Sequence, residues 1–305
     1  MKQNLRKKAL VPAIAMVVAS VIALSGVTYA WFTTGNTASV TGLDVNVQTA
    51  NGIQVSLDAS AWRSVITAND IKNAVSNAVA YSNRLIQFPE VEIAPVSSAG
   101  NVVDGKLEMF YGEYNKDGTL MSKSEVEQNR TTAGNFVAFD LFFKSSMDQT
   151  LTLNLGDATS FVKGTDALGG LATVGTEKAV RVAFLPMGSA QTAAAARALK
   201  GNGEVLVWEP NADSRADGVE ADGGKLAYKG FKAEFAGVAE DSLGDDEVKT
   251  VATFNETKDI VELKAGINKM RVYIWLEGQD VDCINNISFG DFTANLSFSV
   301  PEVEG

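Results

Sequence analysis

The chain has 305 residues, 46% of them hydrophobic, and its 37 acidic against 26 basic side chains give a formal net charge of −11. Nucleic acid and anionic membrane surfaces repel a chain of this charge, so we expect neither as a partner. The sequence has no histidine and one cysteine, which excludes serine triads, Cys–His pairs, the H-E-x-x-H zinc helix and four-cysteine metal sites.

The beginning of the chain has the pattern of an export signal. Basic residues between Lys2 and Lys8 precede an apolar core, Ala9–Leu24, and no further charged residue occurs before Asp44. The core is longer than a typical signal core and shorter than the roughly 20 residues that span a bilayer. We therefore expect a cleavable signal peptide, with a retained membrane anchor as the alternative.

The small residues Thr28 and Ala30 suit a signal peptidase, which predicts cleavage after Ala30 and a mature chain that begins at Trp31. Four basic charges leave with the signal, so the mature chain would carry −15. The expected organisation is a signal peptide over residues 1–30 and one domain over residues 31–305. The expected location is the cell surface or a secreted matrix, with membrane contact only through the uncleaved signal segment.

Most of the mature chain alternates between apolar and polar residues, which is typical of strands with one buried face. Leu43–Val47 alternates, Asn51-Gly52 follows, and Ile53–Leu57 alternates again, which predicts a β-hairpin. A further alternating strand, Asp291–Val300, closes the chain. The other predicted strands are Lys106–Tyr111, Phe136–Phe143, Leu151–Leu155, Ala179–Leu185, Val205–Trp208, Val248–Phe254, Ile260–Leu263 and Met270–Leu276.

Two stretches have helical character instead. Thr67–Ala80 has the spacing of a capping box between its first residue and Asp70. Gln191–Lys200 is rich in alanine, with Ser189 before it as the expected cap and Gly201 after it as the expected stop. We expect both helices at the ends or on a flank of the sheets. The predicted fold class is mainly β, a jelly-roll-like antiparallel β-sandwich with one or two short helices.

Four local features have both a functional and a structural interpretation. Glu113–Leu120 imitates the start of a calcium loop, but the closing glutamate comes one position late, which favours an Asp-Gly turn between strands. The acidic loop Asn211–Asp222 is interpreted as solvated, and Cys283 as a buried thiol with pairing between molecules as the alternative. Some aromatic residues could stack on a carbohydrate, although packing in the sheets is the commoner explanation. These are Trp208, Tyr228, Phe231, Tyr273 and Trp275.

The segment Leu24–Ala30, followed directly by Trp31-Phe32-Thr33, carries a resemblance that extends to about Val45. It resembles the SipW-type signal peptides of the TasA/camelysin class of secreted proteins. A shorter likeness to the same class lies in Ile274–Gly278 together with Asp282-Cys283. The resemblance implies a jelly-roll-like secreted subunit, cut by a dedicated signal peptidase, that in TasA-like members assembles into extracellular or biofilm-matrix fibres.

The expected function is structural rather than enzymatic, with no catalytic residue, no cofactor and no metal. Camelysin-type members are described as metalloproteases, but a chain without histidine lacks the usual zinc ligands. A glycosidase needs only two carboxylates, and no such pair is visible in the sequence. We therefore expect a subunit of an extracellular fibre or biofilm matrix whose partners are copies of itself. The alternative is a monomeric surface adhesin or carbohydrate-binding protein.

The predicted assembly element is the new N-terminus, whose apolar residues are Trp31, Phe32 and Val40. An extended segment of this kind can add to the sheet of a neighbouring copy, because edge strands present unpaired backbone groups. In the alternative, Trp31–Val40 folds back onto its own domain as an ordinary first strand or stays frayed.

Overall fold

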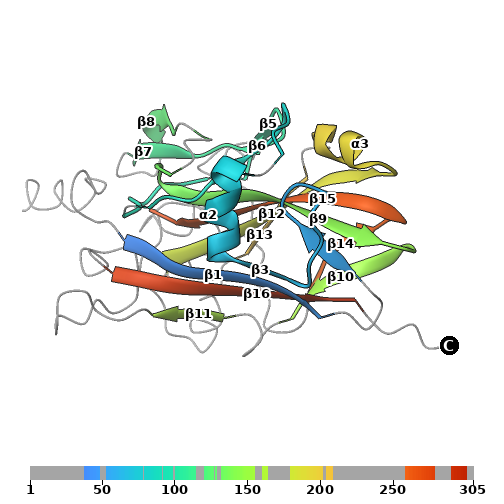
Figure 1. The fold of residues 1–305 in the computed structure, drawn as a ribbon. Coiled ribbons are helices and arrows are strands. Elements are labelled where there is room, and N and C mark those ends of the chain that lie inside the picture. The colour runs from blue at the N-terminus through green and yellow to red at the C-terminus, as the bar shows by residue number, and fades with distance from the viewer. Residues whose placement is uncertain are drawn as a thin grey trace, which may run out of the picture.

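Two six-stranded β-sheets stack face to face, and short strands, loops and a helix form a further layer over the second sheet (Figure 1). The predicted fold class, a mainly β antiparallel sandwich with short helices, is confirmed, and the jelly-roll connectivity stays a prediction. The structure is a computed structural model. It describes residues 38–48, 53–77, 79–90, 92–98, 100–114, 120–126, 128, 132–154, 160–163, 179–201, 204–208, 258–278 and 290–300.

The first sheet, sheet A, contains both the first and the last described strand. The strands β1 and β16 are neighbours and run parallel, whereas the other pairings in this sheet are antiparallel. The predicted closing strand is confirmed as β16. The order is β14 (Lys258–Leu263), β10 (Gln149–Leu153), β16 (Gly290–Ser299), β1 (Ala38–Gln48) and β3 (Val65–Thr67), with β11 (Ser160–Lys163) also paired to β16.

The second sheet, sheet B, is built around three long antiparallel strands that the sequence predicted. Its order is β13 (Leu206–Trp208), β12 (Val180–Ala190), β15 (Gly266–Leu276), β9 (Phe136–Ser145) and β2 (Gln54–Ser56), with β4 (Ile86–Gln87) also paired to β9. The remaining predicted strand, Val248–Phe254, lies outside the described residues.

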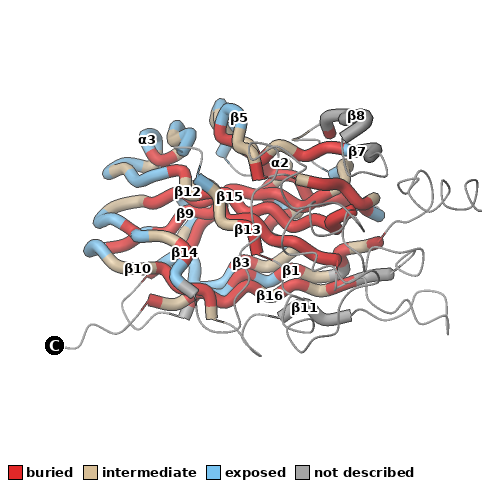
Figure 2. The backbone as a smooth tube through the Cα atoms, turned by 180° about the vertical axis from the view of Figure 1, so that it is seen from behind, coloured by how far each residue is buried: buried red, intermediate tan, exposed pale blue. Residues whose placement is uncertain are grey.

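A continuous apolar core fills the space between the sheets. Phe298 of β16 meets Phe143 of β9 and Phe184 of β12, with ring centroids 5.8 and 5.9 Å apart and nearly perpendicular planes. Edge-to-face contacts of this kind add about 0.5–1.5 kcal/mol each beyond the area that they bury. Figure 2 shows buried backbone along the strands of both sheets, with exposed positions gathered at strand ends and in the covering layer.

The predicted hairpin between Leu43–Val47 and Ile53–Leu57 is wrong. The first segment lies in β1 of sheet A and pairs with β16, while the second enters β2 of sheet B and pairs with β9. Alternation reports only that each segment has one buried face. A chain that crosses from one sheet to the other meets this condition as well as a hairpin does, because both segments then face the same core.

The outer layer covers the face of sheet B that points away from sheet A (Figure 1). It includes the hairpin of β5 (Val102–Val103) and β6 (Lys106–Leu107) and the hairpin of β7 (Phe110–Tyr114) and β8 (Leu120–Glu125). The single strand predicted over Lys106–Tyr111 is wrong, because β6 ends at Leu107 and pairs with β5, whereas β7 begins at Phe110 and pairs with β8. Beneath this layer lies a second apolar cluster, so β9 and β15 are buried on both faces.

Helix α2 (Ala68–Asn77) stands across the flank of the sandwich, against β3 of sheet A and β4 of sheet B (Figure 1). The predicted capping box is confirmed: the Thr67 backbone N–H and hydroxyl donate to Asp70 at 2.9 and 2.8 Å, and the Asp70 N–H donates back to the hydroxyl at 3.2 Å. The helix inserts Ile71 and Ala74 into the core between the sheets.

Helix α3 (Ala193–Ala198) is shorter than predicted and begins at a different cap. Thr192, not Ser189, accepts the capping hydrogen bond, from the Ala195 N–H. The reason is that β12 continues as far as Ala190, which leaves Ser189 inside the strand.

One ionic cluster joins the outer layer to sheet B. Asp140 of β9 accepts from Arg271 of β15 at 2.7 Å, from Lys269 at 3.2 Å and from the Tyr81 hydroxyl at 2.8 Å. The side chains of the three charged residues are at most 1% exposed. The cluster has two positive charges and one negative charge, and a backbone carbonyl helps to offset the difference. Arg271 and Lys269 both donate to the carbonyl of Asn83, at 2.7 and 3.1 Å. We call Asp140, Lys269 and Arg271 the buried ion cluster.

We predict that Asp140→Asn lowers the free energy of unfolding by about 3–5 kcal/mol, because two buried cations lose their counter-charge. Urea denaturation measures this loss. The matched control is Asp148→Asn, which removes an exposed pair with Lys264 and is expected to leave stability close to that of the unaltered chain. Equal, small effects of both substitutions would contradict the role assigned to the cluster.

Candidate functional site

The position of β1 is the first candidate site. Although it is the first strand that the structure describes, it lies inside sheet A and not at an edge. It pairs with β16 along its whole length, from Ala38 opposite Gly290 to Gln48 opposite Ser299. On its other side it meets β3 only opposite Asp44–Asn46, and Ala38 exchanges two backbone hydrogen bonds with Ile93.

The core-facing side chains of β1 are buried, and Val40, one of the predicted assembly residues, belongs to this set. Val40 is 8% exposed and lies opposite Phe292 of the same chain. The other four are Ala38, Leu43, Val45 and Val47. In this single chain β1 thus fills a groove between β16 and β3, which we call the β1 groove. The predicted residues Thr28, Ala30, Trp31 and Phe32 lie outside the described residues.

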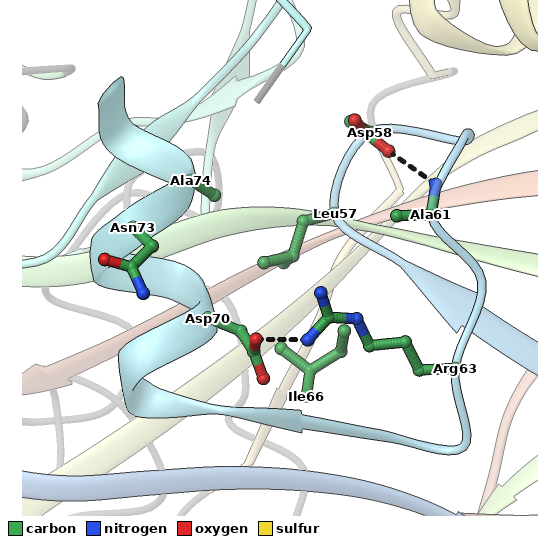
Figure 3. A pocket seen from close by; sticks show the side chains of 8 residues that line it. All are labelled: Leu57, Asp58, Ala61, Arg63, Ile66, Asp70, Asn73 and Ala74. Atoms are coloured by element: carbon green, nitrogen blue, oxygen red, sulfur yellow. Dashed lines mark hydrogen bonds and ion pairs between the residues drawn. The ribbon is translucent and has the colours of Figure 1, made fainter. Parts of the chain in front are cut away.

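A pocket of about 220 Å³ is the second candidate site. It opens between α2 and the loop that leads from β2 to β3, and Figure 3 shows the side chains that line it. Leu57 and Ile66 supply apolar lining, and Arg63 reaches across towards α2. The complete lining is Leu57, Asp58, Ala61, Arg63, Ile66, Asp70, Asn73 and Ala74.

Both carboxylates of the pocket are held in the ionised form. Burial alone would raise the pKa of Asp58, but hydrogen bonds lower it to about 2; they come from the Ser60 side chain, from the Ala61 and Ser60 N–H groups at 3.1 and 2.8 Å, and from the Ser56 hydroxyl. The pKa of Asp70 is likewise lowered against the effect of burial, because Thr67 donates to its carboxylate and Arg63 pairs with it.

This arrangement favours binding over catalysis. The eight lining residues supply carboxylates, a guanidinium and an amide, but no hydroxyl, thiol or imidazole nucleophile. A general acid that works near neutral pH needs a raised pKa, and both carboxylates here are shifted the other way. At roughly 30 Å³ per water molecule, the volume corresponds to about seven waters. A small ligand with a polar group for Arg63 or Asn73 and an apolar body would fit.

We predict that Asp58 stabilises the fold above pH 4 and that this contribution is lost towards pH 2. Its pKa is 3.8 when unperturbed and about 2 in the folded state, so the unfolded chain binds the proton first as the pH falls. In Asp58→Asn, the melting temperature should change less between pH 4 and pH 2 than in the unaltered chain. Glu90→Gln, an exposed carboxylate elsewhere, is the control. If the melting temperature of Asp58→Asn falls as much between pH 4 and pH 2 as that of the unaltered chain, the assignment is wrong.

The aromatic residues singled out as a carbohydrate surface are buried where the structure describes them. Tyr273 and Trp275 do lie on the opposite face of β15 from Val272 and Ile274, but the outer layer covers that face. The Tyr273 hydroxyl donates to Gln128 at 3.2 Å and accepts from the Leu107 N–H at 3.0 Å. The core-packing interpretation is confirmed for both, and also for Trp208, which is 4% exposed.

The calcium-loop and acidic-loop candidates lie largely outside the described residues. Residues 115–119 are among those not described, but β7 and β8 on either side pair as a hairpin, with Tyr114 opposite Leu120, which agrees with a turn between strands. Tyr228, Phe231, Cys283 and the loop Asn211–Asp222 also lie outside. Within the described ranges, no three or more Asp, Glu or Cys side chains gather in a way that could hold a metal ion. Nor does any helix in those ranges have the length and apolarity needed to cross a bilayer.

The sequence argument missed the buried ion cluster and the pocket. A signal for the cluster was present, since Asp140 interrupts the apolar run Phe136–Phe143 and Lys269 and Arg271 alternate with apolar residues. A charge inside such a run is expected to have a buried partner. The pocket had no comparable signal, because Arg63 and Asp70 come together only through the path of the loop and the helix.

The fold and the two sites define a class: a β-sandwich with one sheet face covered by an outer layer, its first described strand inside a sheet, and a small pocket on its flank. Searches with protein-family models, curated proteins and solved structures gave no match to this chain.

Proposed function

We propose that this protein is a secreted structural subunit of an extracellular fibre or biofilm matrix, and that copies join by exchanging β1. The observation that supports the proposal is the place of β1, the first described strand, inside sheet A and parallel to the last described strand. Each copy has the same groove, so a strand that fills its own groove can also fill that of another copy. Repeated in one direction, this exchange builds a filament.

The energetics of the exchange depend on contacts that form only between copies. Burial of β1 contributes equally in a closed monomer and in a filament, so these contacts cancel in the comparison. Association costs about 4–15 kcal/mol. Trp31 and Phe32 precede β1 and would bury about 1.5–3 kcal/mol each on a neighbour. Contacts between subunit faces must therefore contribute too, and assembly should depend on concentration.

Salt should also affect assembly. The predicted mature chain carries a net charge of −15, which opposes the close approach of copies. Screening of exposed charges by salt weakens this repulsion. The proposal therefore favours assembly at physiological rather than low ionic strength.

We predict that a disulfide between β1 and β16 links copies in assembled material. Asp44 and Asn295 are register partners, and adjacent strands lie about 4.8 Å apart, within the range for a disulfide. The test uses Asp44→Cys with Asn295→Cys in a Cys283→Ser background, assembled under reducing conditions and then oxidised. A denaturing gel without reductant should show a ladder of covalent multimers.

The matched control places the cysteines at Lys144 and Ile267, which are register partners on β9 and β15 of sheet B. This pair should close within each chain and give only monomers. If the β1–β16 variant forms fibres, but its oxidised chains also give only monomers on the gel, exchange of β1 is refuted.

The flank pocket supports a second candidate, a monomeric surface protein that binds a small ligand such as a sugar. It predicts that a panel of monosaccharides and short carboxylates contains a ligand whose calorimetric binding is lost in Arg63→Gln, with fibre formation unaffected. Because Arg63 also pairs with Asp70, Asn73→Ala is the second variant, which leaves that pair intact. Absence of binding heat across the panel would contradict this candidate.

A further inference from the structure

The core-facing positions of β1 change phase within the strand. Ala38 and Val40 face the core at even numbers, whereas Leu43, Val45 and Val47 face it at odd numbers. The partner β16 keeps one phase throughout, with Phe292, Ala294, Leu296 and Phe298 buried. A bulge between Val40 and Gly42 absorbs the extra residue, so that both halves of β1 can face the core.

Directly after the bulge, two neighbouring pairs are complementary in size. Gly42 lies opposite Thr293, and a Cβ at position 42 would come within 3.0 Å of the Thr293 Cγ2. The next pair places the large Leu43 opposite the small Ala294, both fully buried. On the face of sheet A that points away from the core, the small Gly42 of β1 lies opposite the larger Thr293 of β16. On the core face, the large Leu43 of β1 lies opposite the small Ala294 of β16.

A displaced register would lose this fit. If β1 slid by one residue, its apolar side chains would turn to the outer face. If it slid two residues towards the end of β16, Leu43 would meet Leu296, and Val40 would meet Ala294, which creates overpacking at one place and a void at the other. The slide would also displace the bulge. It now lies between Ala38, which pairs with Ile93, and Asp44–Asn46, which pair with β3, and it would move towards β3.

We infer that Gly42 and Leu43 of β1, with Thr293 and Ala294 of β16, form a steric key that admits β1 to the β1 groove in one register. The occupant is the β1 strand of the same chain or of a second copy. An unrelated strand with uninterrupted alternation lacks the bulge and the small–large order. The inference rests on the proposed exchange of β1 and adds to it the residues that decide which strand is accepted.

Exchange between copies allows the key to be tested by complementation. Leu43→Ala leaves a void in its own groove, and Ala294→Leu overfills its own groove, so each variant alone should assemble poorly. In a mixture, the altered strand of the first fits the altered groove of the second, and the remaining strand and groove are those of the unaltered chain. The mixture should therefore yield about tenfold more sedimentable filament than either variant alone, with both chains present in equal amounts.

A second pair guards against variants that fail to fold. Gly42→Val and Thr293→Ser change the outer face of the same contact without touching the core, and they should complement in the same way. The double variant Leu43→Ala with Ala294→Leu in one chain should recover the melting temperature that each single substitution lowers.

The outcomes separate the key from the proposed function. If the single variants form filaments as well as the unaltered chain does and the mixtures add nothing, the key is wrong while exchange of β1 stands. If the unaltered chain forms neither filaments nor the β1–β16 disulfide ladder, the proposed function is wrong and the role of the key in exchange falls with it.

Discussion

The parallel pairing of β1 with β16 is the interaction on which the sandwich depends. It joins the first and last described strands in one sheet and supplies two adjacent rows of apolar side chains to the core. Phe298, which links β16 to β9 and β12 across the two sheets, lies opposite Val47 of β1. Without β1, one side of β16 and the core beneath it would be open to water. Because β1 carries this much of the core, the proposed exchange of β1 would connect the stability of one chain with the assembly of many.

The outer layer imposes a second constraint, because it buries the faces of β9 and β15 that point away from sheet A. Two interactions attach this layer to sheet B: apolar packing and the hydrogen bonds of the buried ion cluster. One carboxylate serves two cations, so the balance of charge depends on backbone carbonyls such as those of Asn83 and Gly105. Burial lowers the pKa of Lys269, and the negative charge of Asp140 acts in the opposite direction. The outer layer is therefore attached through groups that are costly to separate from one another.

Local patterns in the sequence were sufficient for the long strands and for one helix cap, but not for the pairing of strands into sheets. Alternation identified β16, runs of apolar residues identified β9, β12 and β15, and the Thr67–Asp70 spacing identified the start of α2. The same alternation gave the wrong hairpin, since which strands pair is decided by contacts between distant segments. The change of phase at Thr41 and Gly42 is visible in the sequence, and it argues for a bulge in β1. Tyr273 and Trp275 show the remaining limit, because the layer that covers them comes from residues far away in the chain.

Transfer of magnetisation between differently labelled copies tests the exchange of β1 most directly. Filaments grown from an equal mixture of ¹⁵N-labelled and ¹³C-labelled mature chains give solid-state NMR contacts between the two labels only across copies. The account predicts cross-peaks that join backbone nitrogens of Leu43–Val47 to carbons of Ala294–Phe298 in the mixed filaments. Filaments in which these cross-peaks occur only when a single chain carries both labels would show that each subunit keeps its own β1, and would contradict the account.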